Sequence, residues 1–399
     1  MNRSSSQNPR PVGLCLSGGG SRAMAFHLGC LRALHSRGTL SKIDVISTVS
    51  GGSLIGAMYA YSDDSFDDFQ LRVQEALQEG FVKSILRQLV SPKTLLPVLA
   101  TNAVAGTVTA STIALRAALG TFERFLPKSS RANATLASQL QPPLRRWASR
   151  TTAFEAALAH RLFGEQLVNS SRRNDINVVI NACELRTGTA FRFGNQETGS
   201  WRFGVLEKNN ATIAMAVAAS AAYPALLPAI DRCLKFVQRG GGESKNHRVI
   251  LTDGGVYDNL GVTCMQPGKD PKFSTNVYSP EYIICCDAGP GQFDATTRPY
   301  SWRTRMVRSF ETTFRQVQHG IQSQLHQWQK HGELKGFVYA YLGQQDSRLP
   351  SIPPGFVKRD QVVNYPTDFS PMPVSDINAL SQRGEQLSQL LIEHYCSHL

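Results

Sequence analysis

The amino-acid sequence predicts an α/β protein of three layers, in which helices cover both faces of a mainly parallel central sheet. A short apolar run over residues 12–16 is followed by a glycine-rich break and then by apolar residues at helical spacing. The same succession recurs over residues 43–60. Because strands that alternate with helices form parallel sheets covered by helices, the repeated pattern predicts this architecture. With 399 residues, of which 42% are hydrophobic, the chain can bury a large core.

We expect one domain over residues 11–399, preceded by a disordered leader over residues 1–10. The leader has no apolar run, so it predicts neither a secretory signal nor an anchor, and we expect synthesis in the cytosol. A helical or lid insertion is expected at about residues 62–150. Its uncharged part, residues 94–115, is long enough to cross a bilayer, but Pro97 and several polar residues make it less apolar than a typical membrane span. A cleft or lid insertion is favoured there, with an interfacial membrane segment and a true span as alternatives.

The composition narrows the possible partners. A net charge of +12 suits nucleic acid, anionic lipid or simple solubility. The Lys and Arg residues lack the aromatic interleaving of a nucleic-acid-binding module, so no nucleic acid is expected as a partner. The eight cysteines show no C-x-x-C pairing. This favours buried free thiols and predicts no metal site.

The first candidate site is a glycine loop between the first predicted strand and helix. It consists of Ser17, Gly18, Gly19, Gly20, Ser21 and Arg22. Successive glycines allow backbone N–H groups to converge at the N-terminus of a helix, where they can hold a negatively charged oxygen. That oxygen belongs either to a phosphate or to the oxyanion that forms during acyl transfer. A tight turn without a ligand is the structural alternative.

The second candidate is Ser50, which directly follows the predicted strand over residues 43–49. Gly51 and Gly52 come next, and a helical pattern follows. This is the layout of a nucleophile elbow, in which a sharp strand-to-helix turn exposes a serine hydroxyl above the sheet. Thr48 stands where the G-x-S-x-G pattern has its first glycine. A serine that only caps the helix is the alternative.

The third candidate is Asp253, at the end of the strand predicted over residues 248–252. Gly254 and Gly255 follow it. Asp-Gly-Gly by itself is usually a turn, but here we expect its loop at the same sheet edge as the glycine loop and Ser50. A carboxylate within hydrogen-bond reach can accept the proton of a serine hydroxyl. The three segments together therefore predict a serine nucleophile with an aspartate base.

Taken in order, these motifs resemble those of the patatin-like phospholipase family. GGGSRA is similar to the oxyanion loop of the family, TVSGGS to its nucleophile motif and DGG to its catalytic Asp-Gly-Gly motif. Residues 181–188 and 219–228 also resemble segments common in the family. The resemblance spans about residues 11–290 and the expected C-terminal helix, but residues 62–150 match no recognisable segment of the family. Ala23 stands in place of the last glycine of the oxyanion loop.

The resemblance implies a three-layer patatin-like fold and a serine esterase of the phospholipase A or lysophospholipase type, which works through an acyl-enzyme without a cofactor. Ser50 would be the nucleophile and Asp253 the base. The oxyanion hole would be formed by Gly18, Gly19, Gly20, Ser21 and Arg22. The elbow and the aspartate loop would be supported by Thr48, Gly51, Gly52, Gly254 and Gly255. No histidine is required.

Nucleotide binding is the alternative function, because the loop GGGSRA also fits G-x-G-x-x-A after a strand. A dinucleotide site needs an acidic residue at the end of the second strand. Ser50 stands there instead, and Asp44 lies at the beginning of that strand. No G-K-[ST] follows the glycines, which excludes a Walker loop.

The same resemblance, combined with the positive charge, predicts the substrate and the location. The substrate would be a phospholipid or another acyl-ester lipid. The enzyme would be cytoplasmic and would bind peripherally to anionic membrane surfaces, to which basic residues are attracted.

Overall fold

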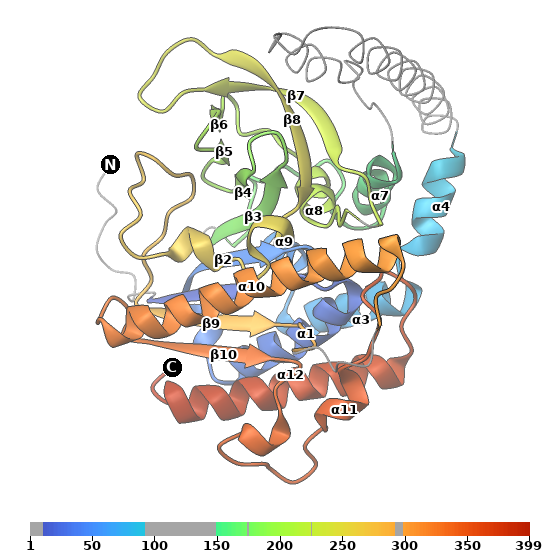
Figure 1. The fold of residues 1–399 in the computed structure, drawn as a ribbon, viewed down its shortest axis with the longest axis vertical. Coiled ribbons are helices and arrows are strands. Elements are labelled where there is room, and N and C mark those ends of the chain that lie inside the picture. Colours follow the sequence, from blue (N-terminus) through green and yellow to red (C-terminus); the bar gives the residue numbers. More distant parts are fainter. Residues whose placement is uncertain (1–10, 92–148, 174, 225, 292–297) are drawn as a thin grey trace, which may run out of the picture.

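The computed structural model describes residues 11–91, 149–173, 175–224, 226–291 and 298–399 (Figure 1). The predicted leader over residues 1–10 lies outside them. So do residues 92–148, which include the uncharged segment 94–115 and most of the predicted insertion. The first part of the insertion is described and contains helices α3 (Phe66–Glu79) and α4 (Val82–Val90).

The centre of the sheet is parallel, as the sequence predicts. Its strands run in the order β10-β9-β1-β2-β3, and every neighbouring pair among them is parallel. The strands are β1 (Val12–Leu16), β2 (Ile43–Val49), β3 (Asn177–Glu184), β9 (Tyr282–Asp287) and β10 (Gly336–Tyr341). Chain segments between these strands form the helices that cover the sheet.

The sequence predicts only the last of the strands beyond β3, over residues 248–252, and not its direction. Beyond β3 the sheet continues with five antiparallel strands. They are β4 (Thr189–Gly194), β5 (Thr198–Ser200), β6 (Gly204–Leu206), β7 (Ile230–Val237) and β8 (Lys245–Asp253). β8 pairs with β7 and also with β3, so the antiparallel strands return to the strand from which they start. This return brings the end of β8 into the middle of the sheet.

Helices lie on both faces of the sheet (Figure 1). One face carries α1 (Gly20–Ser36), α2 (Gly51–Ala60), α3, α8 (Ile213–Ser220) and α12 (Val374–Tyr395). The other face carries the short helix η3 (Val262–Met265) and the long helix α10 (Trp302–Lys330). The remaining helices are η1 (Thr39–Lys42), α7 (Arg150–Leu158), η2 (Ala159–Phe163), α9 (Gly255–Asp258), η4 (Asp346–Arg348) and α11 (Arg359–Val362).

The strands divide their apolar side chains between two cores. Successive side chains on a strand point to opposite faces, so both faces of this sheet are buried. Leu14 and Leu16 of β1 face α1 and α12, whereas Cys15 between them faces η3 and α10. In the same way Cys285 and Cys286 of β9 belong to opposite cores, as their adjacent positions predict. All eight cysteines are free thiols, and only Cys233 is exposed.

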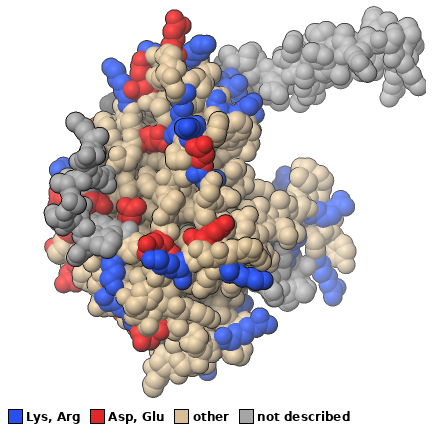
Figure 2. All heavy atoms as spheres, turned by 90° about the vertical axis from the view of Figure 1, so that its left-hand side faces the viewer, with Lys and Arg blue, Asp and Glu red and all other residues tan. Residues whose placement is uncertain are grey.

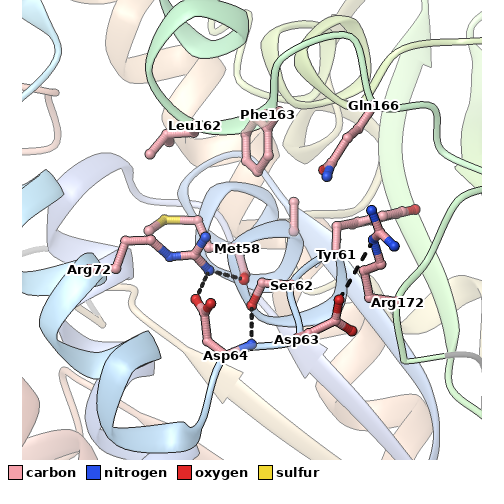
Figure 3. A pocket seen from close by; sticks show the side chains of 11 residues that line it. Met58, Tyr61, Ser62, Asp63, Asp64, Arg72, Leu162, Phe163, Gln166 and Arg172 are labelled. Atoms are coloured by element: carbon pink, nitrogen blue, oxygen red, sulfur yellow. Dashed lines mark hydrogen bonds and ion pairs between the residues drawn. The ribbon is translucent and has the colours of Figure 1, made fainter.

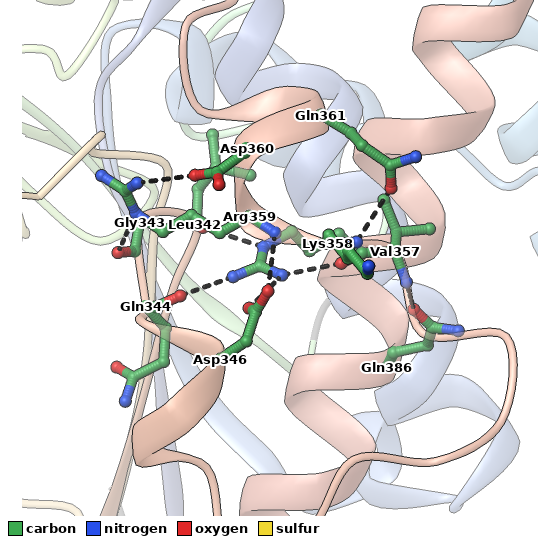
Figure 4. A network of polar contacts seen from close by, with 11 residues as sticks. Leu342, Gly343, Gln344, Asp346, Val357, Lys358, Arg359, Asp360, Gln361 and Gln386 are labelled. Carbon is green, nitrogen blue, oxygen red and sulfur yellow. Dashed lines mark hydrogen bonds and ion pairs between the residues drawn. The ribbon is translucent and has the colours of Figure 1, made fainter.

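A buried arginine ties the chain after β10 to α12 (Figure 4). Arg383 of α12 is completely buried and donates to the backbone carbonyl groups of Leu342, Gln344 and Val357. Its guanidinium also forms an ion pair with Asp346 at 2.9 Å. Burial lowers the pKa of Arg383, and the Asp346 carboxylate opposes that shift. The segment that follows β10 is thereby held against the helical layer.

Two classes of structure are not found among the described residues. No described helix is both long enough and apolar enough to cross a membrane. The described part of the chain also contains no group of three or more His, Cys, Asp or Glu residues that could hold a metal ion.

Candidate active site

Ser50 lies at the turn between β2 and α2 in a backbone conformation that favours glycine. Its φ is 51° and its ψ is −118°. Among the described residues, only Ser50 and Asn276 combine a side chain with positive φ. Such residues cost about 1–3 kcal/mol each and persist where the surrounding structure holds them. The sharp turn predicted at Ser50 is therefore present and strained.

The two glycines after Ser50 allow the turn to pack against the glycine loop. A Cβ atom on Gly51 would overlap the carbonyl oxygen of Gly20, and one on Gly52 would overlap the carbonyl oxygen of Leu16. Larger residues at either position would push the elbow away from the loop. Thr48, which replaces a glycine of the usual pattern, donates through its hydroxyl to the carbonyl group of Val179 on the neighbouring strand β3.

Ser220, at the end of α8, holds the backbone of the elbow, although no sequence motif indicates this role. Its hydroxyl accepts a hydrogen bond of 2.9 Å from the backbone N–H of Ser50. It donates to the carbonyl group of Asn181 at 2.5 Å and lies 2.8 Å from the hydroxyl of Ser53. Because a hydroxyl has a single proton, Ser53 is the donor in that last pair.

Asp253 reaches Ser50 through the pairing of two strands with β3. Val49 pairs with Asn181 of β3, and Asp253 pairs with the next residue, Ala182. The direction of β8 differs from the expectation, since it runs antiparallel to β3 and enters from the opposite end. The two candidate residues meet because β2 and β8 both end beside the middle of β3.

The Asp253 carboxyl is buried and bonded to two groups. One oxygen accepts a hydrogen bond of 2.7 Å from the backbone N–H of Gly255, and the side chain of Ser50 also bonds to it. Burial raises the pKa of Asp253 to about 7, although both hydrogen bonds act in the opposite direction. Gly254 lies so close to β3 that a Cβ atom would overlap the carbonyl oxygen of Asn181. A carboxyl with such a pKa can both accept and return a proton near neutral pH.

The glycine loop lies directly beside Ser50. A Cβ atom on Gly18 would come within 3.2 Å of the Cβ atom of Ser50. The N–H of Gly18 donates to the carbonyl group of Asn259, and that of Ser21 donates to the carbonyl group of Asp368. Within the described residues, the N–H groups of Gly19 and Gly20 have no acceptor. Of the predicted oxyanion residues, Gly18 and Ser21 have their backbone N–H groups engaged, whereas Gly19 and Gly20, within the described part of the chain, do not.

Arg22, the last predicted oxyanion residue, is almost fully buried. One of its amino groups donates to the backbone carbonyl group of Tyr365 at 2.9 Å. Burial lowers the pKa of Arg22 to about 10, and nearby Asp287 opposes the shift, so the side chain stays charged at neutral pH. The Tyr365 contact ties the glycine loop to a segment far along the chain.

Two groups of residues near the site carry no signal in the sequence. The segment 365–371 lies over the glycine loop, where Asp368 accepts the N–H of Ser21 and would collide with a Cβ atom on Gly20. An aromatic group lies next to the aspartate loop. Phe310 of α10 packs against Tyr223, and Phe314 lies within 2.9 Å of where a Gly255 Cβ would be. These rings form an apolar wall beside Asp253.

The histidines nearest in sequence to the candidate residues make other contacts. His27 of α1 is hydrogen-bonded through Nε2 to the carbonyl group of Ser17. His247 lies within β8, six residues before Asp253, and stacks on Phe203. In the described part of the chain, no histidine is bonded to Ser50 or Asp253.

A separate pocket lies at the far end of α2 from Ser50 (Figure 3). Its charged side chains are paired with one another. Arg72 forms an ion pair of 2.7 Å with Asp64, and Arg172 lies 3.9 Å from Asp63. Because Ser50 begins α2 and Tyr61 of this pocket follows its end, the helix separates the pocket from the candidate active site.

The chain matches a known protein family over most of its length. The family model for patatin-like phospholipases matches residues 14–263, more than half of the chain. The chain belongs to the patatin-like phospholipase family. The match includes all three predicted motifs but ends before α10 and the segment 365–371. No curated protein sequence matches this patatin-like chain.

Several solved structures are similar to this patatin-like protein. VipD from Legionella pneumophila is 16% identical over 98% of this chain and 68% of its own, with a TM-score of 0.38. Human GIVD cytosolic phospholipase A2 is 13% identical over 98% and 60%, with a TM-score of 0.49. The type III effector protein ExoU is 14% identical over 97% and 54%, with a TM-score of 0.32. The chain thus spans three fifths or less of the last two proteins.

Proposed function

We propose that this chain is a lipid acyl hydrolase that cleaves carboxylic esters through Ser50 and Asp253. Family membership supports hydrolysis of lipid esters as the class of activity. One observation carries the assignment of the residues. The strained Ser50 is bonded through its side chain to a buried carboxyl whose pKa is raised to about 7. The family match does not support nucleotide binding, the alternative function of the glycine loop, because the matching family consists of phospholipases.

The proposed reaction has two steps and uses no other side chain as a base. The Ser50 hydroxyl attacks the ester carbonyl carbon while its proton passes to the Asp253 carboxylate. The N–H groups of Gly19 and Gly20 stabilise the oxyanion. Collapse of this intermediate forms the acyl-enzyme, and the leaving alcohol takes the proton from Asp253. Water then attacks the acyl group and gives its proton to Asp253, which returns it to Ser50.

A lipid hydrolysis profile of the purified protein tests this proposal. Wild-type protein should release fatty acid from phospholipids or lysophospholipids, and a fluorophosphonate should label Ser50. Ser50→Ala and Asp253→Asn should each lower the rate by several orders of magnitude, and the double variant should lose little more because the two residues act as one unit. Ser41→Ala, which changes an exposed serine, is the control. An unchanged rate in either single variant would refute the pair.

We also propose that the protein binds anionic membranes peripherally through the start of α10. Over most of the face in Figure 2, Lys and Arg are interspersed with Asp and Glu, so the net charge does not mark a single basic patch on that face. The first turns of α10 differ. Trp302 and Met306 are 69% and 54% exposed, Arg303 and Arg305 lie between them, and no acidic residue occurs over residues 298–310. Exposed apolar and basic residues together suit an anionic lipid surface.

A further inference from the structure

A buried arginine on β4 forms no ion pair with any carboxylate of the described residues. Arg192 is 2% exposed and pairs in the sheet with Asn181. Its guanidinium donates to the carbonyl group of Thr275 at 2.8 Å, and also to the hydroxyl groups of Ser274 and Thr263. All of these acceptors are neutral. Within the described residues Arg192 forms no ion pair, and its Nε atom has no acceptor. A buried charge of this kind is costly unless a counter-ion accompanies it.

A second cation lies beside it. Lys269 is partly buried and donates to the carbonyl group of Thr263 at 2.6 Å, so Thr263 contacts both cations. Burial, together with the positive charge of Arg192, lowers the pKa of Lys269 to about 8. Among the described residues Lys269 forms no ion pair either. The carboxylate of Asp258, which acts on Lys269 from a distance, is already bonded to three backbone N–H groups.

Both cations line one cavity of about 360 Å³, which we call the Arg192 pocket. Ser274 and Thr275 line it as well. Its remaining walls include three aromatic side chains that are partly in solvent. Phe273 is 75% exposed, Trp201 is 54% exposed and Tyr257 is 38% exposed. Asp270, an exposed residue whose carboxylate accepts the N–H of Lys272, contributes the acidic group among the lining residues.

We propose that the Arg192 pocket binds the phosphate group of an anionic lipid headgroup. This pocket is separate from the site at which an ester reacts with Ser50. Two neighbouring cations that have no ion-pair partner in the described part of the chain suit a phosphate. Its charge balances both, and its oxygens accept hydrogen bonds from several donors. The Ser274 hydroxyl adds a polar contact. The aromatic rim has the amphipathic character of side chains that lie at the boundary between water and lipid. The choice of a lipid as the source of the phosphate rests on the proposed function.

The pocket is connected to the candidate active site through the aspartate loop. Tyr257 lies four residues after Asp253, and Thr263, which contacts both cations, is held by Asp258. The backbone carbonyl group of Asn181, opposite Arg192 in the sheet, accepts a hydrogen bond from the hydroxyl group of Ser220 and so supports the elbow. A phosphate in the pocket would therefore brace the segment that runs from Asp253 to Lys269.

Binding of soluble phosphates to the full-length Ser50→Ala protein tests the site. Inorganic phosphate and glycerol 3-phosphate are titrated in a calorimeter, and we expect saturable binding. Lys269→Gln should weaken it about ten-fold or more, because a hydrogen bond to a charged group is lost. Lys272→Gln removes an exposed charge from the same loop but not from the pocket, and should leave binding unchanged. Arg192→Met should abolish binding, and Lys269→Gln carries the test if that variant does not fold.

No binding, or equal weakening by Lys269→Gln and Lys272→Gln, would overturn the site. Phosphatidylcholine vesicles with and without phosphatidic acid then identify the source of the phosphate. We expect the gain in binding from phosphatidic acid to shrink in Lys269→Gln and in Phe273→Ser. If that gain is independent of Lys269, the headgroup assignment is wrong. Because binding is measured in the Ser50→Ala protein, an absence of esterase activity in the wild type would refute the proposed function and leave this result intact.

Discussion

The hydroxyl group of Ser220 accepts a hydrogen bond of 2.9 Å from the backbone N–H of Ser50. Ser220 ends α8, and Ser50 lies between β2 and α2, so the bond joins segments 170 residues apart. Because the same hydroxyl also donates to Asn181 of β3, it fixes the elbow relative to the strand beside which Asp253 ends. The strained backbone of Ser50 is held in place partly by this contact.

Replacing Ser220 should therefore reduce both activity and stability. In Ser220→Ala the N–H of Ser50 loses its acceptor in a buried position, which should lower the free energy of unfolding by about 1–3 kcal/mol. We expect kcat to fall about ten-fold or more while KM changes little, because the nucleophile is displaced but the lipid contacts remain. Ser53→Ala removes one partner of Ser220 and leaves the bond to Ser50, so it is the matched control. Equal activity of Ser220→Ala and wild type would contradict this role.

The positive φ of Ser50 predicts an unusual order of stability. The free energy of unfolding should be about 1 kcal/mol higher for Ser50→Gly than for Ser50→Ala, since glycine adopts this conformation without strain. Ser53, within α2, provides the comparison. At that position Ser53→Ala should be more stable than Ser53→Gly by up to about 1 kcal/mol, because alanine favours the helical conformation more than glycine does. Chemical denaturation of the four proteins measures both differences, and the same order at both positions would show that Ser50 is unstrained.

The pKa of Asp253 predicts how the rate depends on pH. The base must be ionised to accept a proton, so kcat/KM for a soluble ester should rise with pH, reach half its maximum near pH 7 and then level off. Below pH 7 the rate should fall about ten-fold per pH unit. A rate that does not change between pH 5 and pH 9 would argue against Asp253 as the base.

The same shift predicts a change in stability of defined sign. Between the ordinary value of 3.8 and about 7, the folded protein keeps a proton on Asp253 that the unfolded chain releases. The free energy of unfolding should therefore fall as pH rises through this range and remain lowered above it. Asp253→Asn should lose this slope, which denaturation at several pH values would measure.

Binding to vesicles should depend on the start of α10. Arg303→Gln and Arg305→Gln should each weaken binding to anionic vesicles by about five-fold, corresponding to about 1 kcal/mol per basic residue near the surface. High salt should release the wild type, because such attraction is screened. Trp302→Ser should weaken binding as well, whereas Leu71→Ser, which changes an exposed leucine on α3, serves as the control. Equal binding to anionic and zwitterionic vesicles in sedimentation would contradict the proposal.

Much of the fold follows from local patterns in the sequence. The runs before Ser17 and before Ser50 are apolar throughout, which is typical of strands buried on both faces, and the structure confirms the parallel centre of the sheet. The sequence predicts β8 but not its antiparallel direction, and it does not predict β4 to β7. Their pattern of alternation is short and irregular, and their pairing depends on contacts with β3 rather than on any local period.

The sequence by itself determined which residues can carry the chemistry. A serine and an aspartate, each at the end of a strand and each followed by two glycines, are visible because the turns they need leave a local signature. Only the tertiary structure decided how they meet. Asp253 lies beside Ser50 because β8 pairs antiparallel with β3 in one register, and Ser220, Phe314 and the segment 365–371 complete the surroundings from distant parts of the chain. Such pairings depend on burial and hydrogen bonding between residues far apart in sequence, which no local spacing records.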